Sequence, residues 1–266
     1  MSTQKSRLAP VFERCSAEER AALVSYLPAG YPTVDGSIDA FKALIDGGTD
    51  IIEVGIPYSD PVMDGATIQA AANTALQAGF RVRDTMRVVE AISAAGGNPV
   101  IMCYWNLVHR YGVDAFARDL ASAGGLGVVT PDLIPDEAGE WIAASTEHGL
   151  DRIFLVAPSS TAERLAMTVE ASSGFVYAAS TMGVTGARTT VSSSAPELVA
   201  RVKAHSDIPV GVGLGVRSGA QAAEIAGYAD AVIVGSALVS AVGEGLPAVE
   251  KLTRELADGV RAGVRA

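Results

Sequence analysis

The sequence contains few cysteines and histidines, with two of the first and three of the second among 266 residues. Cys15 and Cys103 cannot form a disulfide framework, and neither these thiols nor the histidines show the spacing of a zinc site. We therefore expect two ordinary buried thiols, a reducing compartment and no metal ion. The histidines, which are His109, His148 and His205, are expected at the surface.

Long apolar runs and an excess of basic residues are also absent. No apolar stretch reaches the roughly 18 residues of a membrane span, and the N-terminus MSTQKSRLAP lacks the apolar segment of a secretory signal. Twenty Lys and Arg against thirty Asp and Glu give a net charge of −10, which disfavours nucleic acid and anionic membranes. We expect a cytoplasmic protein that holds any phosphorylated ligand through local dipoles.

Several motifs of known chemistry are missing as well. The sequence has no GxSxG elbow, no CxxC pair and no nucleotide P-loop. The stretch GVGLGV at 211–216 does not fit a full dinucleotide fingerprint. Lys42, Lys203 and Lys251 fall in predicted helices, away from the strand ends where a Schiff-base lysine is expected. We expect no cofactor.

What the sequence does contain is a regular alternation of apolar strands and helices. Most predicted strands are continuous runs rich in valine and isoleucine, as is typical of parallel strands covered on both faces. The eight predicted strands are 22–28, 50–56, 99–105, 126–130, 152–157, 175–180, 209–214 and 230–235.

Helix signals lie between these strands. Ser160 with Glu163, Ser194 with Glu197 and Ser218 with Gln221 have the spacing of a capping box. Further helices are predicted at 4–20, 36–47, 65–78 and 83–95, the first of them closing the bottom of the fold. Eight strand–helix units without a linker favour a closed (β/α)₈ TIM barrel formed by 1–266 as a single domain. A doubly wound open sheet is the alternative.

One strand carries an unusual acid. In IIEVGIPYSDPVMDG, at 51–65, Glu53 lies inside an apolar strand, where desolvation would raise its pKa and suit it to acid–base chemistry. Asp60 and Asp64 follow on the loop, where carboxyl ends of barrel strands form the active site. The alternatives are a structural carboxylate satisfied by a neighbouring donor for Glu53, a turn for Asp60 and a helix cap for Asp64.

Glycine clusters at three later strand ends form a second group. GVTG at 183–186, GLG at 213–215 and GS at 235–236 follow the sixth, seventh and eighth predicted strands. Free N–H groups after the last two strands of a barrel commonly bind phosphate, and glycine allows close approach. Tight barrel turns are the alternative explanation.

These segments together resemble one family. EVGIPYSDPVMDGATIQAA at 53–71, LPAGYP at 27–32, GVTGAR at 183–188 and GVGLGV at 211–216 are similar to the alpha chain of tryptophan synthase, over roughly residues 5–260. The resemblance implies a lyase of tryptophan biosynthesis. Its reaction is retro-aldol cleavage of indole-3-glycerol phosphate to indole and glyceraldehyde 3-phosphate.

The resemblance also implies roles for individual residues. Glu53 and Asp64 would be catalytic, and Asp60 would lie on a mobile loop facing the partner subunit. The expected pocket residues are Tyr26, Tyr104 and Tyr177, and the expected phosphate-binding residues are Gly186, Gly213, Gly215, Gly235 and Ser236. Exposure of Asp64 on its loop, against burial of Glu53, would keep the first ionised while the second carries a proton.

The family's partner is a pyridoxal-phosphate beta chain in an α₂β₂ assembly, and 56–64 and 181–194 are candidate lids. Tyr26 and Tyr58 stand where the family commonly has phenylalanine. Trp105 is expected at the third strand's end, narrowing the mouth, and Arg188 and Arg217 are expected in solvent or near the phosphate. Two other functions stay open at this point: a different sugar-phosphate barrel enzyme, and a weakly active phosphate-binding regulatory subunit.

Overall fold

A computed structural model describes residues 5–179, 194–213 and 215–263. The strands within these ranges form one parallel sheet in the order β5-β4-β3-β2-β1-β9-β8-β7-β6. Their bounds are β1 Ala22–Pro28, β2 Ile51–Gly55, β3 Pro99–Met102, β4 Gly127–Val129, β5 Asp151–Ile153, β6 Leu155–Val156, β7 Val176–Ala179, β8 Val210–Gly213 and β9 Ala231–Val234.

The sheet closes into a barrel through the segment predicted as a single strand at 152–157. Its two halves, β5 and β6, are the two ends of the sheet order and are separated in the chain by Phe154 alone. β5 pairs with β4, whereas β6 pairs with β7. The predicted (β/α)₈ barrel is therefore confirmed and the open sheet is wrong, and the fifth predicted strand is two short ones.

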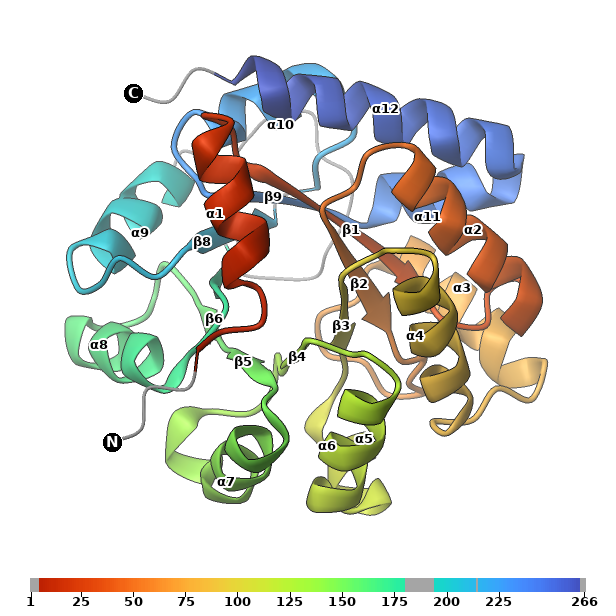
Figure 1. The fold of residues 1–266 in the computed structure, drawn as a ribbon, viewed down its shortest axis with the longest axis horizontal. Helices are drawn as coiled ribbons and strands as arrows, with labels where there is room; N and C mark the ends of the chain where they lie inside the picture. Colours follow the sequence, from red (N-terminus) through yellow and green to blue (C-terminus); the bar gives the residue numbers. More distant parts are fainter. Residues whose placement is uncertain (1–4, 180–193, 214, 264–266) are drawn as a thin grey trace.

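The helices other than α1 surround the strands, and α1 lies across the end of the barrel (Figure 1). Their bounds are α1 Ala9–Ala17, α2 Val34–Asp46, α3 Ala66–Gln77, α4 Asp84–Ala94, α5 Trp105–Tyr111, α6 Val113–Ser122, α7 Gly139–His148, α8 Ala162–Ala171, α9 Ser194–Lys203, α10 Gly219–Ala226, α11 Ser236–Glu244 and α12 Leu246–Ala262, with a 3-10 turn η1 at Pro135–Glu137. The helices predicted at 36–47, 65–78 and 83–95 are confirmed within two residues at each end. No helix in the described parts of the chain has both the length and the apolar composition to cross a membrane.

Two of the three predicted caps can be compared with the structure. The Ser218 side chain accepts a hydrogen bond from the Gln221 N–H, as predicted. The cap predicted at Ser160 is wrong, because Thr161 caps α8 by accepting from the Arg164 N–H. Ser160 instead accepts from the Ala157 N–H in the preceding turn. The residue before Ser194 lies outside the described ranges, so that cap stays a prediction.

The third strand is shorter than predicted. β3 ends at Met102, and Trp105 is the first residue of α5 instead of the last residue of a strand. The Trp105 ring lies 6.2 Å from that of Trp141, which is fully buried in the layer between strands and helices. Trp105 therefore packs against the outer core and does not end a strand as predicted, while its effect on the width of the mouth stays a prediction.

Both faces of the strands are covered. Every residue of β1 and β2 is buried, which explains their unbroken apolar runs. One apolar cluster lies between strands and helices, and a second fills the barrel interior together with α1. Phe12 of α1 packs on Phe175 with ring centroids 5.9 Å apart, so α1 closes one end of the barrel, as predicted for the N-terminal segment.

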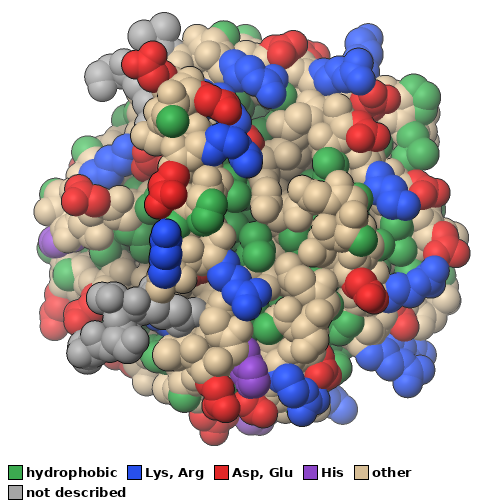
Figure 2. Space-filling view, in the orientation of Figure 1, with side chains coloured by type: hydrophobic (Ala, Val, Ile, Leu, Met, Phe, Trp, Pro, Cys, Tyr) green, Lys and Arg blue, Asp and Glu red, His purple; other side chains and the backbone are tan. Residues whose placement is uncertain are grey.

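At the same end of the barrel, a buried ion pair joins the segments that precede β1 and β2. Arg20 lies two residues before β1 and Asp50 directly before β2, and Arg20 donates to the two Asp50 carboxylate oxygens at 2.6 and 2.9 Å. The Leu23 N–H donates to Asp50 as well, at 2.9 Å. Figure 2 shows the face on which α1 lies, where acidic and basic side chains are interspersed. This face carries no large patch of one charge sign.

Candidate active site

The strands place three predicted site residues inside the barrel. Val24 on β1, Ile51 on β2 and Phe175, directly before β7, belong to the interior cluster. Because side chains alternate along a strand, the residues two positions further on also face inward. These are Tyr26, Glu53 and Tyr177, all one layer closer to the carboxyl ends of the strands, where barrel active sites form.

Glu53 is enclosed there without a partner. The residue is 2% exposed, and its Oε2 has no hydrogen-bond partner within residues 5–179, 194–213 and 215–263. Desolvation, with a smaller contribution from the charge of Asp64, raises the pKa of Glu53 to about 8. The carboxyl therefore carries a proton at neutral pH, as expected for a strand acid, and the alternative of a carboxylate satisfied by neighbouring donors does not describe Oε2.

Asp64 corrects the sequence analysis. It lies on the loop after β2, but it is only 6% exposed, so the expectation of a solvated carboxylate is wrong. Its Oδ1 accepts a hydrogen bond from the Tyr104 hydroxyl at 3.0 Å, a bond to another part of the barrel in place of the predicted helix cap. Burial raises the pKa of Asp64, and this hydrogen bond opposes the rise. The two acids thus differ in their hydrogen bonds. Asp64 accepts one from Tyr104, whereas Oε2 of Glu53 accepts none from the described residues.

Tyr104, a predicted pocket residue, is hydrogen-bonded to Asp64. It is buried at the N-terminus of α5, and its hydroxyl accepts from the Met63 N–H at 3.1 Å while donating to Asp64. Sequence reasoning placed Tyr104 in the pocket but missed this link, since the partners lie 40 residues apart. Asp132 then fixes the start of α5 by accepting from the Trp105 N–H at 2.9 Å.

Tyr104→Phe removes the hydroxyl but keeps the ring. We expect the rate of substrate cleavage to fall about 10- to 100-fold, because a hydrogen bond to a charged group contributes about 1.5–3 kcal/mol. Steady-state kinetics over a range of substrate concentrations would measure it. Tyr111→Phe is a matched control, because its hydroxyl bonds Asp119 on the outer helices. Equal rates for the two variants would show that Tyr104 does not act through Asp64.

Asp60 lies further out on the same loop. It is exposed, and its carboxylate accepts from the Ser59 hydroxyl at 2.6 Å. Next to it, Val62 is 68% exposed, and Ile134 on the loop after β4 is 47% exposed. Sequence reasoning missed both apolar residues, because exposure at a strand-end loop is set by the fold. The Tyr58 hydroxyl accepts from Asn106 at 3.3 Å, which links this loop to α5.

The predicted phosphate-binding residues lie at the ends of two paired strands. Gly213 ends β8, while Gly235 and Ser236 follow β9 at the N-terminus of α11. Gly215 has a φ of +68°, a conformation that glycine adopts without strain. Free N–H groups at a helix N-terminus favour an anion. Gly186 and Arg188 lie outside the described residues, and Arg217 is exposed, as expected.

These glycines have a second reason to lack a side chain. A Cβ on Gly213 would lie 2.5 Å from the Tyr177 hydroxyl, and one on Gly235 would lie 3.3 Å from the Tyr26 ring. The two glycines therefore make room for the predicted pocket tyrosines. Turn geometry alone does not account for them.

The two cysteines and one cavity do not belong to this group of side chains. Cys15 and Cys103 are buried free thiols, as predicted, and burial raises the pKa of Cys15 to about 11. A cavity of about 340 Å³ lies between α1 and the segments 173–174 and 208–209. It is at the end that α1 closes, opposite the carboxyl ends of the strands, so it is not the candidate active site.

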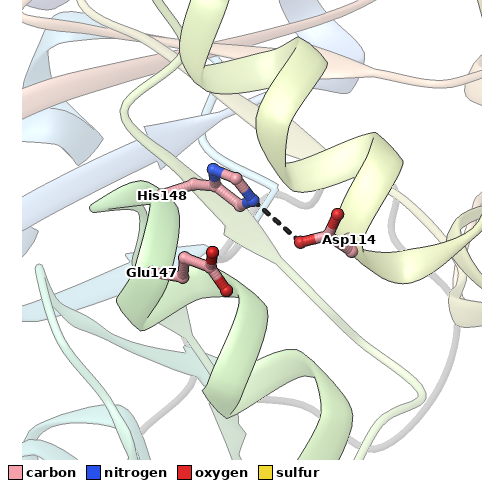
Figure 3. Close-up of side chains that lie close together, drawn as sticks. All are labelled: Asp114, Glu147 and His148. Atoms are coloured by element: carbon pink, nitrogen blue, oxygen red, sulfur yellow. Dashed lines mark hydrogen bonds and ion pairs between the residues drawn. The ribbon is translucent and has the colours of Figure 1, made fainter.

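One surface group has metal-ligating side chains. Asp114, Glu147 and His148 place their ligand atoms within 4.8 Å of one another (Figure 3). Asp114 already pairs with His148 at 2.9 Å, at the start of α6 and the end of α7. His148 is thus partly buried and hydrogen-bonded to Asp114, and not a fully solvated residue as expected, whereas His109 and His205 are exposed. This hydrogen bond accounts for the proximity of Asp114 and His148 without a metal.

Comparison with known proteins points to one family. The family model described as tryptophan synthase alpha chain matches residues 12–263. The tryptophan synthase alpha chain of Mycobacterium tuberculosis (strain ATCC 25618 / H37Rv) is 71% identical over 264 residues, which cover 99% of this chain and 98% of the relative. That of Mycobacterium avium (strain 104) is 70% identical over 260 residues, covering 97% and 96%.

Solved structures agree. A structure of Mycobacterium tuberculosis tryptophan synthase matches with a TM-score of 0.94 and 71% identity, covering 97% of this chain and 99% of that chain. The tryptophan synthase subunit alpha from Legionella pneumophila str. Paris matches with a TM-score of 0.85 at 30% identity, covering 96% and 98%. The likeness in sequence and fold extends over nearly the whole chain.

Proposed function

This chain belongs to the tryptophan synthase alpha-chain family, and on that premise we propose that Glu53 and Asp64 carry out its reaction. As an alpha subunit, the protein is a carbon–carbon lyase of tryptophan biosynthesis that cleaves indole-3-glycerol phosphate to indole and glyceraldehyde 3-phosphate. The observation that best supports the two residues is the burial of Glu53, whose pKa is raised and whose Oε2 has no partner among the described residues, beside the Asp64 loop at the barrel mouth.

Glu53 acts as acid and then as base. Carbon 3 of indole is a poor leaving group as a carbanion, so Glu53 first gives it a proton. The bond between this carbon and the glycerol chain then breaks, and its electron pair returns to the ring. The neighbouring hydroxyl becomes the aldehyde and loses its proton to the Glu53 carboxylate, which restores the acid. Glu53 gives one proton and regains one, so the proton count balances. Protonation of the ring makes carbon 3 a better leaving group, which is the role that a metal or cofactor would otherwise fill.

Asp64 acts on the other end of the ring. Positive charge grows on the indole nitrogen when carbon 3 is protonated. A carboxylate that accepts the ring N–H stabilises this charge, and Tyr104 holds the carboxylate in place for it. Tyr26 and Tyr177 form part of the pocket around the ring.

The phosphate is held at the opposite side of the mouth. The backbone of Gly213, Gly215 and Gly235 and the start of α11 at Ser236 supply N–H groups and a favourable helix dipole, and Gly186 would add to them. A local site of this kind is required, because the net charge of −10 repels a phosphorylated substrate.

The partner is the beta chain of tryptophan synthase. We infer an α₂β₂ assembly in the cytoplasm, with residues 1–266 as one domain. Asp60, Val62 and Ile134 belong to the surface that faces the beta chain, since they are exposed at the mouth from which indole leaves. Exposed apolar side chains of this size suit a protein interface better than solvent.

One assay tests this function. The isolated chain is given indole-3-glycerol phosphate, indole release is measured, and the beta chain is then added. Release that depends on Glu53 and Asp64 supports the proposal. A chain that never releases indole but still stimulates the beta chain would instead be a regulatory subunit. Turnover of another sugar phosphate only would indicate a different barrel enzyme.

A further inference from the structure

The ring of Tyr26 crosses the inside of the barrel from β9 to β2. A Cβ on Gly55, the last residue of β2, would lie 2.3 Å from the Tyr26 hydroxyl oxygen and 2.5 Å from Cε2. A Cβ on Gly235, after β9, would lie 3.3 Å from Cδ1 on the other edge of the ring. The hydroxyl therefore lies directly over β2, and not over β1 from which the side chain comes.

This position is on the strand face of Glu53. Glu53 and Gly55 are two residues apart on β2, so both face the barrel interior. In the β1–β2 ladder Tyr26 pairs with Glu53, which puts the two side chains in one layer. Both are buried, and Oε2 of Glu53 has no hydrogen-bond partner in the described parts of the chain.

Two other hydroxyls lie at the mouth. The Tyr104 hydroxyl donates to Asp64 on the loop after β2. The Tyr177 hydroxyl, from β7, lies against Gly213 of β8, and the charge of Glu53 acts on it more strongly than that of Asp64. Asp64 is the acidic group coupled to Glu53, and a carboxylate cannot donate. Tyr26 is the tyrosine that lies on a strand paired with that of Glu53, in register with it and with its hydroxyl over β2.

We propose that the Tyr26 hydroxyl is a positioning group that donates a hydrogen bond to the Glu53 carboxylate once Glu53 has given its proton to the substrate. The proposal rests on the assignment of Glu53 as the catalytic acid. In the protonated state Oε2 is unpaired, and a turn of the carboxyl toward the hydroxyl over Gly55 pairs it when the charge appears.

The physical reason is the cost of an unpaired charge. A carboxylate formed at this depth loses its hydration, and Asp64 adds like-charge repulsion. A donor to the ionised form offsets part of this cost and lowers the pKa of Glu53 toward the working pH. Burial, followed by the charges of Asp64 and Glu53, raises the pKa of Tyr26 far above neutrality, so its hydroxyl stays a donor.

The family's common phenylalanine supplies the test. Tyr26→Phe keeps the ring over Gly55 and Gly235 and removes the hydroxyl alone. In the complex with the beta chain, kcat and KM for indole-3-glycerol phosphate are measured from about pH 5.5 to 9.5. We expect kcat to fall about tenfold, KM to change little, and the apparent pKa of Glu53 in the profile to rise by about one unit.

Tyr58→Phe is the matched control. It also removes a hydroxyl from a tyrosine at the mouth, but that hydroxyl bonds Asn106. The apparent pKa in the profile should stay unchanged in this variant. A direct titration of Glu53 by ¹³C-carboxyl NMR in wild type and Tyr26→Phe gives the shift independently of turnover.

Two results would overturn the proposal. One is an unchanged pKa of Glu53 in Tyr26→Phe by both methods, which would make the hydroxyl part of the pocket wall. The other is a higher KM with the pKa unchanged, which would make it a substrate contact. The proposed function fails differently, through Glu53→Gln retaining activity, so the two failures are distinguishable.

Discussion

Glu53→Gln is expected to lower the rate of indole-3-glycerol phosphate cleavage by about 10²–10⁴-fold, the usual contribution of a positioned acid–base group. Glutamine keeps the size and polarity of the side chain but can neither give nor take the proton. Indole release by the complex with the beta chain measures the loss. Glu90→Gln, an exposed change on α4, is the matched control and should retain full activity. Activity of Glu53→Gln near that of wild type would refute the assignment.

The same variant has a pH signature. Because the pKa of Glu53 is about 8, the wild-type acid is protonated below that pH and loses its proton above it. We therefore expect wild-type cleavage to fall above about pH 8, whereas the residual activity of Glu53→Gln shows no such step. A profile of kcat against pH for both proteins would show the difference.

Glu53→Gln should lose activity but gain folding stability at high pH. The folded state holds the Glu53 proton up to about pH 8, whereas an unfolded glutamate releases it near pH 4.3. Wild type therefore loses stability as the pH rises between these values, and the loss is complete above the higher one. At pH 9 we expect Glu53→Gln to be more stable by on the order of 2–4 kcal/mol in urea unfolding, because no charge is buried. Such a result would be a stability–activity trade-off, in which wild type keeps its catalytic acid at the expense of folding stability.

Asp50→Ala is expected to lower the free energy of unfolding by about 3–5 kcal/mol, the usual cost of removing one partner of a buried ion pair. It removes the two hydrogen bonds from the buried Arg20 guanidinium to Asp50, so that Arg20 keeps those to Glu18 and to the Ala21 carbonyl, and it removes the side-chain acceptor of the Leu23 N–H. Urea unfolding at pH 7 measures the change. Asp39→Ala, an exposed change on α2, is the control and should stay within about 0.5 kcal/mol of wild type.

The pH dependence follows from the sign of the pKa shift. Burial alone would raise the pKa of Asp50, but the hydrogen bonds from Arg20 and from the Leu23 N–H outweigh it and hold the pKa below its ordinary value. The stabilisation is therefore present at neutral pH and is lost as the pH falls below about 4. Catalysis by the folded variant should be preserved, because Asp50 lies at the amino ends of the strands. A loss under 1 kcal/mol, or no acid-dependent difference, would contradict the role.

The barrel could be predicted because its signal is local. Continuous apolar runs indicate strands buried on both faces, and β1 and β2 are buried throughout. Element ends were less predictable. Cys103 and Tyr104 continue the apolar run beyond β3, yet they are buried at the mouth outside the strand, so burial and strand pairing give different boundaries. Ser160 and Thr161 both have a hydroxyl able to cap α8, and the turn after β6 decides between them.

Glu53 and Asp64 also differ in how far their surroundings could be predicted from the sequence. A glutamate inside IIEVGI must be desolvated wherever that strand packs, so its raised pKa follows from its neighbours in the chain. Asp64 in PVMDG has only loop residues beside it, and its burial comes from Tyr104, 40 residues later on the adjoining unit of the barrel. The Arg20–Asp50 pair and the Tyr26 hydroxyl over Gly55 likewise join separate strands.

The sequence by itself therefore determined the strand–helix order, the position of the buried acid and the family. Only the tertiary structure decided which donor each acid has and which apolar side chains remain in solvent. The reason is that periodicity and desolvation along a strand depend on adjacent residues, whereas hydrogen bonds at a barrel mouth depend on strands that meet only when the sheet closes.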